Sequence, residues 1–213
     1  MNIDPNYYSL SVFTPDSSLT NSDFLRTVAI ETAKMSYPGS MSRGRKPVVI
    51  KNAKDKIERY FVDNFDLKTI WRKLGEVADN YDKSHKQWAE RLGSFLERDC
   101  LGNPDNTPAT VAAKFIDTFM HQLMKYERFR PLWPHLHLPL DSRVLNMFSR
   151  IDESEAMELV RPKIGDHKTA YTIPYETYAE IQTTLWAFIA ELNRRPNVEV
   201  RFCSRIELNW LWL

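Results

Sequence analysis

A lysine and an aspartate in this sequence are residue types that can carry out covalent chemistry at an electrophilic carbon. Lys114 lies in the segment TVAAKFI, and Asp141 lies in LPLDSRVL. A neutral lysine amine can attack an electrophilic carbon, and a carboxylate can stabilise the positive charge that develops there. The sequence therefore predicts a catalytic pair, provided that the fold brings both residues into one cleft.

Each residue of the pair is predicted to lie on or beside a helix. Thr107 and Pro108 are typical of a helix start, and apolar residues follow at helical spacing, with Lys114 beside them. Three prolines between residues 127 and 140 predict an extended connection. Asp141 then begins a helix that runs to about residue 150.

The composition favours a mainly helical protein. The 213 residues are 43% hydrophobic and 27% charged, with only six glycines and few runs of β-branched residues. Further helices are expected over residues 22–37, 66–77, 84–96 and 172–192. We therefore expect an all-α fold over residues 1–213, as a single domain or as two closely packed helical lobes with the active-site cleft between them.

The net charge and the cysteine content argue against a strongly basic nucleic-acid-binding protein and against a disulfide-rich protein. A net charge of +1 gives no overall basic signature, so nucleic-acid binding would depend on a local basic surface. Cys100 and Cys203 are too few for a disulfide framework and lack metal-type spacing, which predicts a reducing compartment and no structural metal.

The N-terminus does not resemble a signal peptide, and no apolar run reaches the ~20 residues that span a bilayer. These features predict a soluble, cytoplasmic protein with no membrane partner.

The segment around Asp141 resembles a turn of the helix-hairpin-helix DNA glycosylase superfamily. In that superfamily a Pro-x-Asp-[Ser/Thr]-x-Val turn places the catalytic aspartate at a helix start, and residues 139–144, PLDSRV, fit this turn. Three further segments resemble, in the same order, the lysine-bearing helix, the helix after the aspartate turn and the closing segment of the archaeal-type 8-oxoguanine DNA glycosylases. These segments are 110–119, 175–182 and 204–213. The resemblance covers roughly residues 80–213.

The resemblance implies a two-lobed helix-hairpin-helix fold and a bifunctional DNA glycosylase/AP lyase that removes an oxidised purine, 8-oxoguanine. Lys114 would form the Schiff base and Asp141 would assist it. The implied partner is double-stranded DNA that contains a damaged or modified base, bound by a monomer that needs no metal or organic cofactor. The candidate base-binding residues are Trp88, Thr118, Pro139 and Trp212. The candidate DNA-binding residues are Arg43, Arg45, Lys46, Arg128, Arg130 and Arg143.

Simpler interpretations of the same residues stay open. Lysine is usually exposed, and Asp117, Thr118 and His121 continue a polar face beside Lys114. Asp141 could serve only as a helix N-cap. The two histidines that flank Leu136, His135 and His137, have a spacing that metal sites use, but phosphate contact or surface exposure is the better interpretation.

Two alternative functions also stay open. One is a glycosylase for another modified base, for example a hypermodified base of phage DNA in a defence role. Its motivation is Leu208, which lies one helical turn before Trp212, where the family has an acid. The other is a non-catalytic nucleic-acid-binding module on the same scaffold, which an exposed Lys114 far from Asp141 would indicate.

Overall fold

The protein is all-α within the residues that the computed structural model describes, and these residues contain no β-strand. They are residues 21–36, 47–65, 67–96, 101, 105–124, 126–151, 154–165, 167, 170–195 and 201–212. No helix in this part of the chain is long and apolar enough to cross a membrane. The all-α class expected from the composition is confirmed for the described residues.

Helices account for most of the described chain. The α-helices are α1 (Asn21–Ser36), α3 (Pro47–Arg59), α4 (Leu67–Arg72), α5 (Leu74–Asp79), α6 (Tyr81–Phe95), α7 (Pro108–Leu123), α8 (Ser142–Phe148), α9 (Glu155–Ile164) and α10 (Tyr175–Arg194). A π-helical turn, η1, spans Tyr60–Asn64. The 3₁₀ segments are η3 (Glu127–His135), η4 (Ala170–Thr172) and η5 (Arg205–Trp212).

Local sequence signals place the two helices that carry the candidate pair. α7 begins directly after Thr107, with Pro108 in its first turn. α8 begins after Asp141, whose side chain accepts hydrogen bonds from the backbone N–H groups of Arg143 and Val144. Both predicted helix starts are confirmed.

Other predicted boundaries were wrong. Lys73 has non-helical backbone angles (φ −121°, ψ 32°), so the helix expected over 66–77 is divided into α4 and α5. α6 already begins at Tyr81, before the predicted start at residue 84. The connection after α7 is not wholly extended, because η3 accommodates two of its prolines in a 3₁₀ helix. The sequence analysis did not predict α9.

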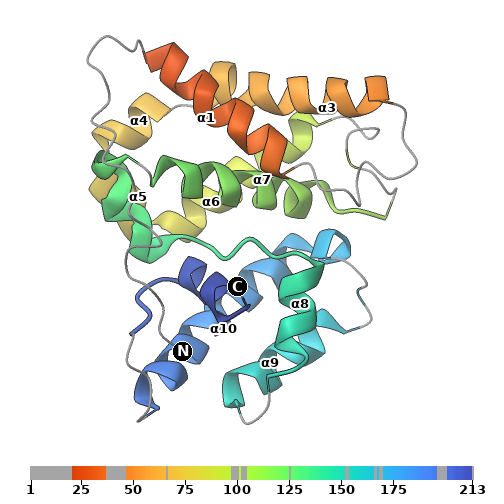
Figure 1. Cartoon of the computed structure of the whole chain (residues 1–213), viewed down its shortest axis with the longest axis vertical. Coiled ribbons are helices and arrows are strands. Elements are labelled where there is room, and N and C mark those ends of the chain that lie inside the picture. Colours follow the sequence, from red (N-terminus) through yellow and green to blue (C-terminus); the bar gives the residue numbers. More distant parts are fainter. Residues whose placement is uncertain are drawn as a thin grey trace.

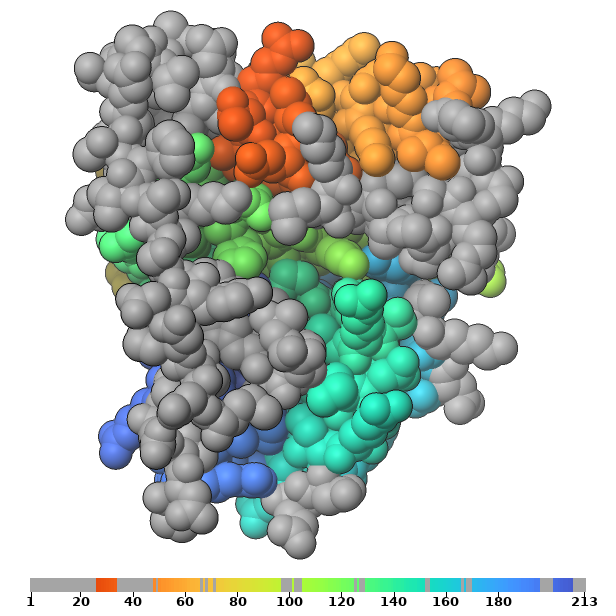
Figure 2. Space-filling model, viewed as in Figure 1, coloured from red at the N-terminus to blue at the C-terminus, as the bar shows by residue number. Residues whose placement is uncertain are grey.

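The helices surround two hydrophobic cores, one above the other in Figure 1. The first core lies among α1, α3, α6 and α7, and the second lies among α8, α9 and α10. Figure 2 shows the same division on one face of the molecule, with α1 and α3 at the top and α8 and α9 below. Each core also takes residues from distant segments, such as Tyr171 of η4 and Ile206 of η5 in the first core. α7 lies between the two cores.

The α7 helix contributes to both cores. Phe119 lies in the first core, where its ring stacks on Phe61 with centroids 4.0 Å apart, whereas Ala113 faces the second core. Between Thr110 and Leu123, only Lys114 and His121 are not fully buried. A helix that is apolar on most sides belongs in the interior. Lys114 therefore projects from a central helix at one of its few openings to solvent.

Gly93 allows α6 to pack closely against the start of α7. A Cβ atom at this position would lie 2.9 Å from the carbonyl carbon of Pro108 and 3.0 Å from the backbone nitrogen of Ala109. Because these contacts are with backbone atoms, we expect Gly93→Ala to destabilise the protein by about 1–3 kcal/mol. Thermal unfolding followed by circular dichroism measures this loss.

Gly75 provides the matched control for this substitution. A Cβ atom there would have no atom within 4 Å. Gly75→Ala should be neutral or raise stability by up to about 1 kcal/mol, because alanine is the better helix former. Equal effects of the two substitutions would contradict the close approach of α6 and α7.

Candidate active site around Lys114 and Asp141

The side chains of Lys114 on α7 and Asp141 before α8 lie next to each other. Nζ of Lys114 is 3.7 Å from Oδ2 of Asp141. This distance suits an ion pair but exceeds that of an ordinary N–H···O hydrogen bond. The lysine side chain is 14% exposed and the aspartate side chain 35% exposed, so both groups can be approached from solvent. The two residues that the sequence singled out are therefore brought together.

The carboxylate of Asp141 has a different partner on each oxygen. Oδ1 accepts hydrogen bonds from the backbone N–H groups of Arg143 at 2.9 Å and Val144 at 3.0 Å. Oδ2 faces the amine of Lys114. The capping bonds to Oδ1 fix the orientation of the carboxylate, and this orientation directs Oδ2 toward the lysine. One side chain can thus serve as both N-cap and functional carboxylate.

Tyr171 is a second partner of the lysine amine. Nζ of Lys114 donates a hydrogen bond to the hydroxyl oxygen of Tyr171 at 3.0 Å. Tyr171 belongs to η4 and is 6% exposed. Sequence reasoning missed this residue because no local pattern relates it to a lysine 57 positions away.

The polar face expected around Lys114 is largely buried, and His121 is its half-buried member. Asp117 and Thr118 are 2% and 9% exposed, and the Thr118 hydroxyl donates to the backbone carbonyl oxygen of Lys114 at 2.9 Å. The interpretation of Lys114 as part of an ordinary solvated face was therefore wrong. The lysine is a partly buried cation on a buried helix.

The remaining candidate base-binding residues have different surroundings. Trp88 packs against the first core, with its ring centroid 5.4 Å from that of Phe65. Pro139 is half-buried in the connection that leads to α8. The side chain of Trp212 lies outside the described part of the chain. In the sequence, Pro139 lies two residues before Asp141, whereas Trp88 lies 26 residues before Lys114.

Two of the candidate DNA-binding arginines are exposed. Arg143 lies two positions after Asp141, in the first turn of α8, and Arg130 lies in η3. Arg43, Arg45, Lys46 and the side chain of Arg128 lie outside the described residues. Arg143 is therefore the candidate phosphate contact closest in sequence to the site.

Glu207, the acid nearest the closing tryptophans, is held within the protein. Its Oε1 accepts a hydrogen bond from the indole N–H of Trp133 at 2.7 Å, and its Oε2 accepts one from the backbone N–H of Cys203 at 2.6 Å. Burial, together with the hydrogen bond to Glu207, raises the pKa of the Cys203 thiol to about 11. Glu207 thus organises the start of η5 and is not free to contact a base.

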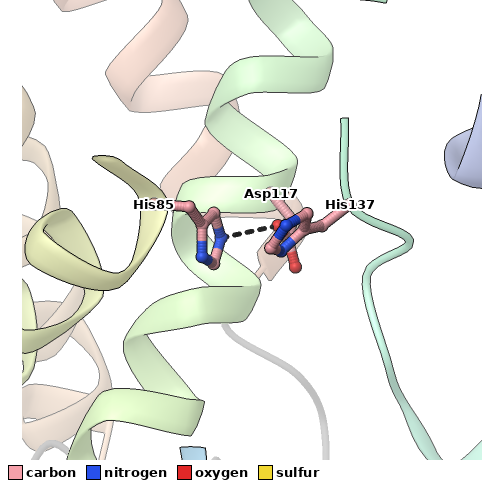
Figure 3. Close-up of side chains that lie close together, drawn as sticks. All are labelled: His85, Asp117 and His137. Carbon is pink, nitrogen blue, oxygen red and sulfur yellow. Dashed lines mark hydrogen bonds and ion pairs between the residues drawn. The ribbon is translucent and has the colours of Figure 1, made fainter. Parts of the chain in front are cut away.

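A separate group of buried polar side chains lies between α6, α7 and the connection before α8. It consists of His85, Asp117 and His137, as Figure 3 shows. Burial, with His85 beside it, lowers the pKa of His137 to about 3, so this imidazole is neutral at neutral pH. The hydrogen bond from His137, with the Arg205 guanidinium nearby, holds the pKa of Asp82 well below its usual range.

Arg205 links this group to the connection that leads to Asp141. Its guanidinium donates hydrogen bonds to the backbone carbonyl oxygens of Leu136 and His135 at 3.3 and 2.6 Å, and to Oδ1 of Asp82 at 3.1 Å. The arginine itself is 1% exposed. Sequence reasoning did not select it, because an arginine in an apolar terminal segment gives no signal of its distant partners.

We expect Arg205→Met to lower the free energy of unfolding by about 3 kcal/mol. Methionine keeps much of the volume but leaves buried carbonyl groups without donors, at about 1–3 kcal/mol each. For a chain of this size the loss corresponds to a fall in Tm of about 6–12 °C. Arg201→Met, at an exposed arginine of the same segment, is the control and should change Tm little. A similar small change for Arg205→Met would show that its hydrogen bonds contribute little.

No protein-family model, curated protein or solved structure matches this chain. The functional argument therefore depends on the residues and on their geometry.

Proposed function

We propose that the protein is a DNA glycosylase with AP lyase activity on a two-lobed helix-hairpin-helix scaffold. The observation that carries the proposal is the 3.7 Å distance between Nζ of Lys114 and Oδ2 of Asp141. These are the two residues that the resemblance names as nucleophile and carboxylate, and they are 27 positions apart in the chain. A non-catalytic module would need neither their proximity nor their partial burial, so the geometry favours catalysis.

The proposed reaction begins on a nucleotide that has been flipped out of the duplex. The amine of Lys114 must first lose its proton, for which Oδ2 of Asp141 is the nearest described carboxylate oxygen. Nζ then bonds to C1′ of the sugar while the bond from C1′ to the base breaks, and the base leaves with the electron pair and takes up a proton. Opening of the sugar ring leaves a Schiff base between Lys114 and C1′. Loss of a C2′ proton then breaks the C3′–O bond and nicks the strand.

Asp141 would stabilise the positive charge that develops on the sugar as the base departs. A fixed carboxylate does this with little reorganisation, and the N-cap bonds on Oδ1 provide that fixation. Tyr171, which accepts a hydrogen bond from Nζ, would position the amine. The pair and the tyrosine together provide a nucleophile, an electrostatic stabiliser and an orienting group.

DNA binding would depend on basic side chains more than on a glycine-rich hairpin. Residues 124–141 contain no glycine, although the superfamily usually has a glycine-rich hairpin before its catalytic aspartate. Exposed Arg143, next to Asp141, and Arg130 are suited to phosphate contact. Because the net charge of the chain is only +1, DNA binding would have to depend on such local basic side chains.

The substrate of first choice is 8-oxoguanine, and one observation favours a second candidate. Leu208 is fully buried in the second core, and both carboxylate oxygens of Glu207 accept hydrogen bonds within the protein. Neither residue supplies the acid that 8-oxoguanine glycosylases of the archaeal type present near their closing tryptophan. A different modified base, such as a hypermodified base of phage DNA, is therefore the alternative substrate.

Borohydride trapping on a panel of duplexes tests the proposal. Each duplex contains one modified base, and an unmodified duplex serves as the control. Borohydride reduces the Schiff base to a stable amine, so turnover leaves protein covalently attached to DNA. An adduct with 8-oxoguanine supports the first substrate, and an adduct with another base alone supports the second. Binding of DNA without an adduct or a nick on any member of the panel would reject catalysis in favour of a binding module.

A further inference from the structure

Three potential metal ligands converge in the interior, apart from the Lys114–Asp141 pair. His85 comes from α6, Asp117 from α7 and His137 from the connection before α8 (Figure 3). One ligand atom from each residue lies within 4.8 Å of those of the other two. The three residues are 0%, 2% and 2% exposed. Imidazole nitrogens and a carboxylate oxygen from three separate elements thus lie close together in the interior.

His137 is oriented as metal-binding histidines usually are. Its Nε2 lies 2.7 Å from Oδ1 of Asp82, and a carboxylate can only accept, so Nε2 carries the proton. The lone pair of a neutral imidazole is then on Nδ1. Nδ1 is 3.4 Å from the hydroxyl oxygen of Tyr178, but the Tyr178 proton is directed to Oδ2 of Asp117 at 2.6 Å. His137 therefore directs a lone pair into the cluster without a strong donor opposite it.

His85 has a corresponding arrangement. Its Nε2 lies 2.9 Å from Oδ1 of Asp117, and its Nδ1 lies 2.8 Å from the hydroxyl oxygen of Tyr175. The Tyr175 hydroxyl can either donate or accept, so His85 can move its proton to Nδ1 and free Nε2 as a ligand. Each histidine thus has a polar partner on the ring nitrogen that faces away from the cluster. Such outer partners fix the orientation of histidine ligands in metal sites.

We propose that His85, Asp117 and His137 bind a divalent transition-metal ion, with Zn²⁺ as the best match. Two imidazoles and one carboxylate are a common zinc ligand set. Ligands at about 2.1 Å from a tetrahedral ion are separated by about 3.4 Å. The 2.9 Å between Nε2 of His85 and Oδ1 of Asp117 would therefore widen by about 0.5 Å, and a pair separated by 4.8 Å would contract by about 1.4 Å. The Tyr178 hydroxyl oxygen lies beside two of the ligands, 2.6 Å from Oδ2 of Asp117 and 3.4 Å from Nδ1 of His137.

The ion would have a structural role next to the candidate active site. Asp117 lies one helical turn after Lys114 on α7, and His137 lies four residues before Asp141. A metal held by both would fix the helix that carries the lysine relative to the connection that leads to the aspartate. Binding of the ion does not depend on the proposed glycosylase activity, and it can be measured without DNA.

Metal binding is tested on the full-length protein. The protein is first dialysed against a chelator and then titrated with Zn²⁺, and bound metal and Tm are measured. We expect about one Zn²⁺ per chain and a rise in Tm, because an ion that binds only the folded state stabilises it. Co²⁺ in place of Zn²⁺ should give the visible absorption of a tetrahedral site with nitrogen and oxygen ligands.

His137→Gln and His135→Gln form the matched pair of variants. His135 is half-exposed and lies two positions earlier, outside the cluster. His137→Gln should lose at least tenfold in Zn²⁺ affinity and the rise in Tm, whereas His135→Gln should keep both. Asp117→Asn, which preserves shape and one acceptor oxygen, should weaken binding in the same way.

A measurement on the unaltered protein covers the case in which a variant does not fold. The chain has five histidines, and NMR of their ring nitrogens should show metal-dependent shifts at two of them. Failure of Zn²⁺ and Co²⁺ to bind or to raise Tm would overturn the proposal and leave a hydrogen-bonded polar network. Binding that is unchanged in His137→Gln and Asp117→Asn would overturn it as well, because the ion would then lie elsewhere. If the unaltered protein binds Zn²⁺ but forms no borohydride-trapped adduct with any duplex of the panel, only the glycosylase proposal is rejected.

Discussion

Lys114→Gln is expected to abolish covalent trapping and strand nicking on any DNA substrate that the unaltered protein cleaves. Glutamine is one atom shorter and keeps an N–H donor in place of the one that bonds Tyr171, but its amide nitrogen has no available lone pair for attack on C1′. We expect a loss of at least about 1,000-fold in the single-turnover rate, since removal of a nucleophile leaves only binding and electrostatic effects. Gel analysis of borohydride-treated reactions measures the adduct and the nicked strand together.

Lys73→Gln is the matched control for this variant. Lys73 is exposed and pairs with Glu76 on the next turn of its own segment, so the same chemical change there should leave the rate unchanged. Circular dichroism and DNA affinity establish that Lys114→Gln is folded and binds. A folded Lys114→Gln protein that still forms the adduct would show that another amine is the nucleophile.

Asp141→Asn is expected to slow base release by about 100- to 1,000-fold while the fold is preserved. The amide oxygen of asparagine can accept the two backbone N–H groups that now bond to Oδ1, so the cap of α8 is kept. The negative charge next to Lys114 is lost, and with it the stabilisation of the cationic sugar and the acceptor for the lysine proton. Single-turnover rates measured with Tm on the same preparations separate chemistry from stability.

Asp141→Ala distinguishes the two roles of this side chain. It removes the charge and the cap together, so it should match Asp141→Asn in rate and be about 1 kcal/mol less stable. If Asp141→Asn retained the full rate, Asp141 would be an N-cap only and the ion pair with Lys114 would be incidental.

The elements that carry the site could be predicted because their signals are local. Pro108 has backbone angles suited to the first turn of α7, and Asp141 accepts hydrogen bonds from nearby backbone N–H groups at the start of α8. Thr107 precedes α7 without a side-chain capping bond, so the proline is the effective signal there. The division at Lys73 and the 3₁₀ form of η3 could not be predicted in this way. Tertiary packing decides such boundaries, because the residues there differ too little in intrinsic helix propensity to determine where a helix breaks.

The partners within the site could be predicted only in part. The resemblance named Lys114 and Asp141, but residue types and spacing did not require that they meet. Tyr171 and Arg205 act through contacts 57 and about 70 positions away in the chain, and no local pattern indicates such contacts. His137 was recognised as a possible ligand, but phosphate contact or surface exposure was preferred, and its burial makes the surface interpretation wrong. The fold supplies partners for it from α6 and α7.

The position of α7 between the two hydrophobic cores determines how the protein should unfold. Because this helix supplies side chains to both hydrophobic cores, neither core can come apart while the other keeps all of its packing. The two halves visible in Figure 1 should therefore unfold as one cooperative unit, with a single transition and with the slowest amide hydrogen exchange along α7. Lys114 thus lies on a segment whose loss of order coincides with global unfolding.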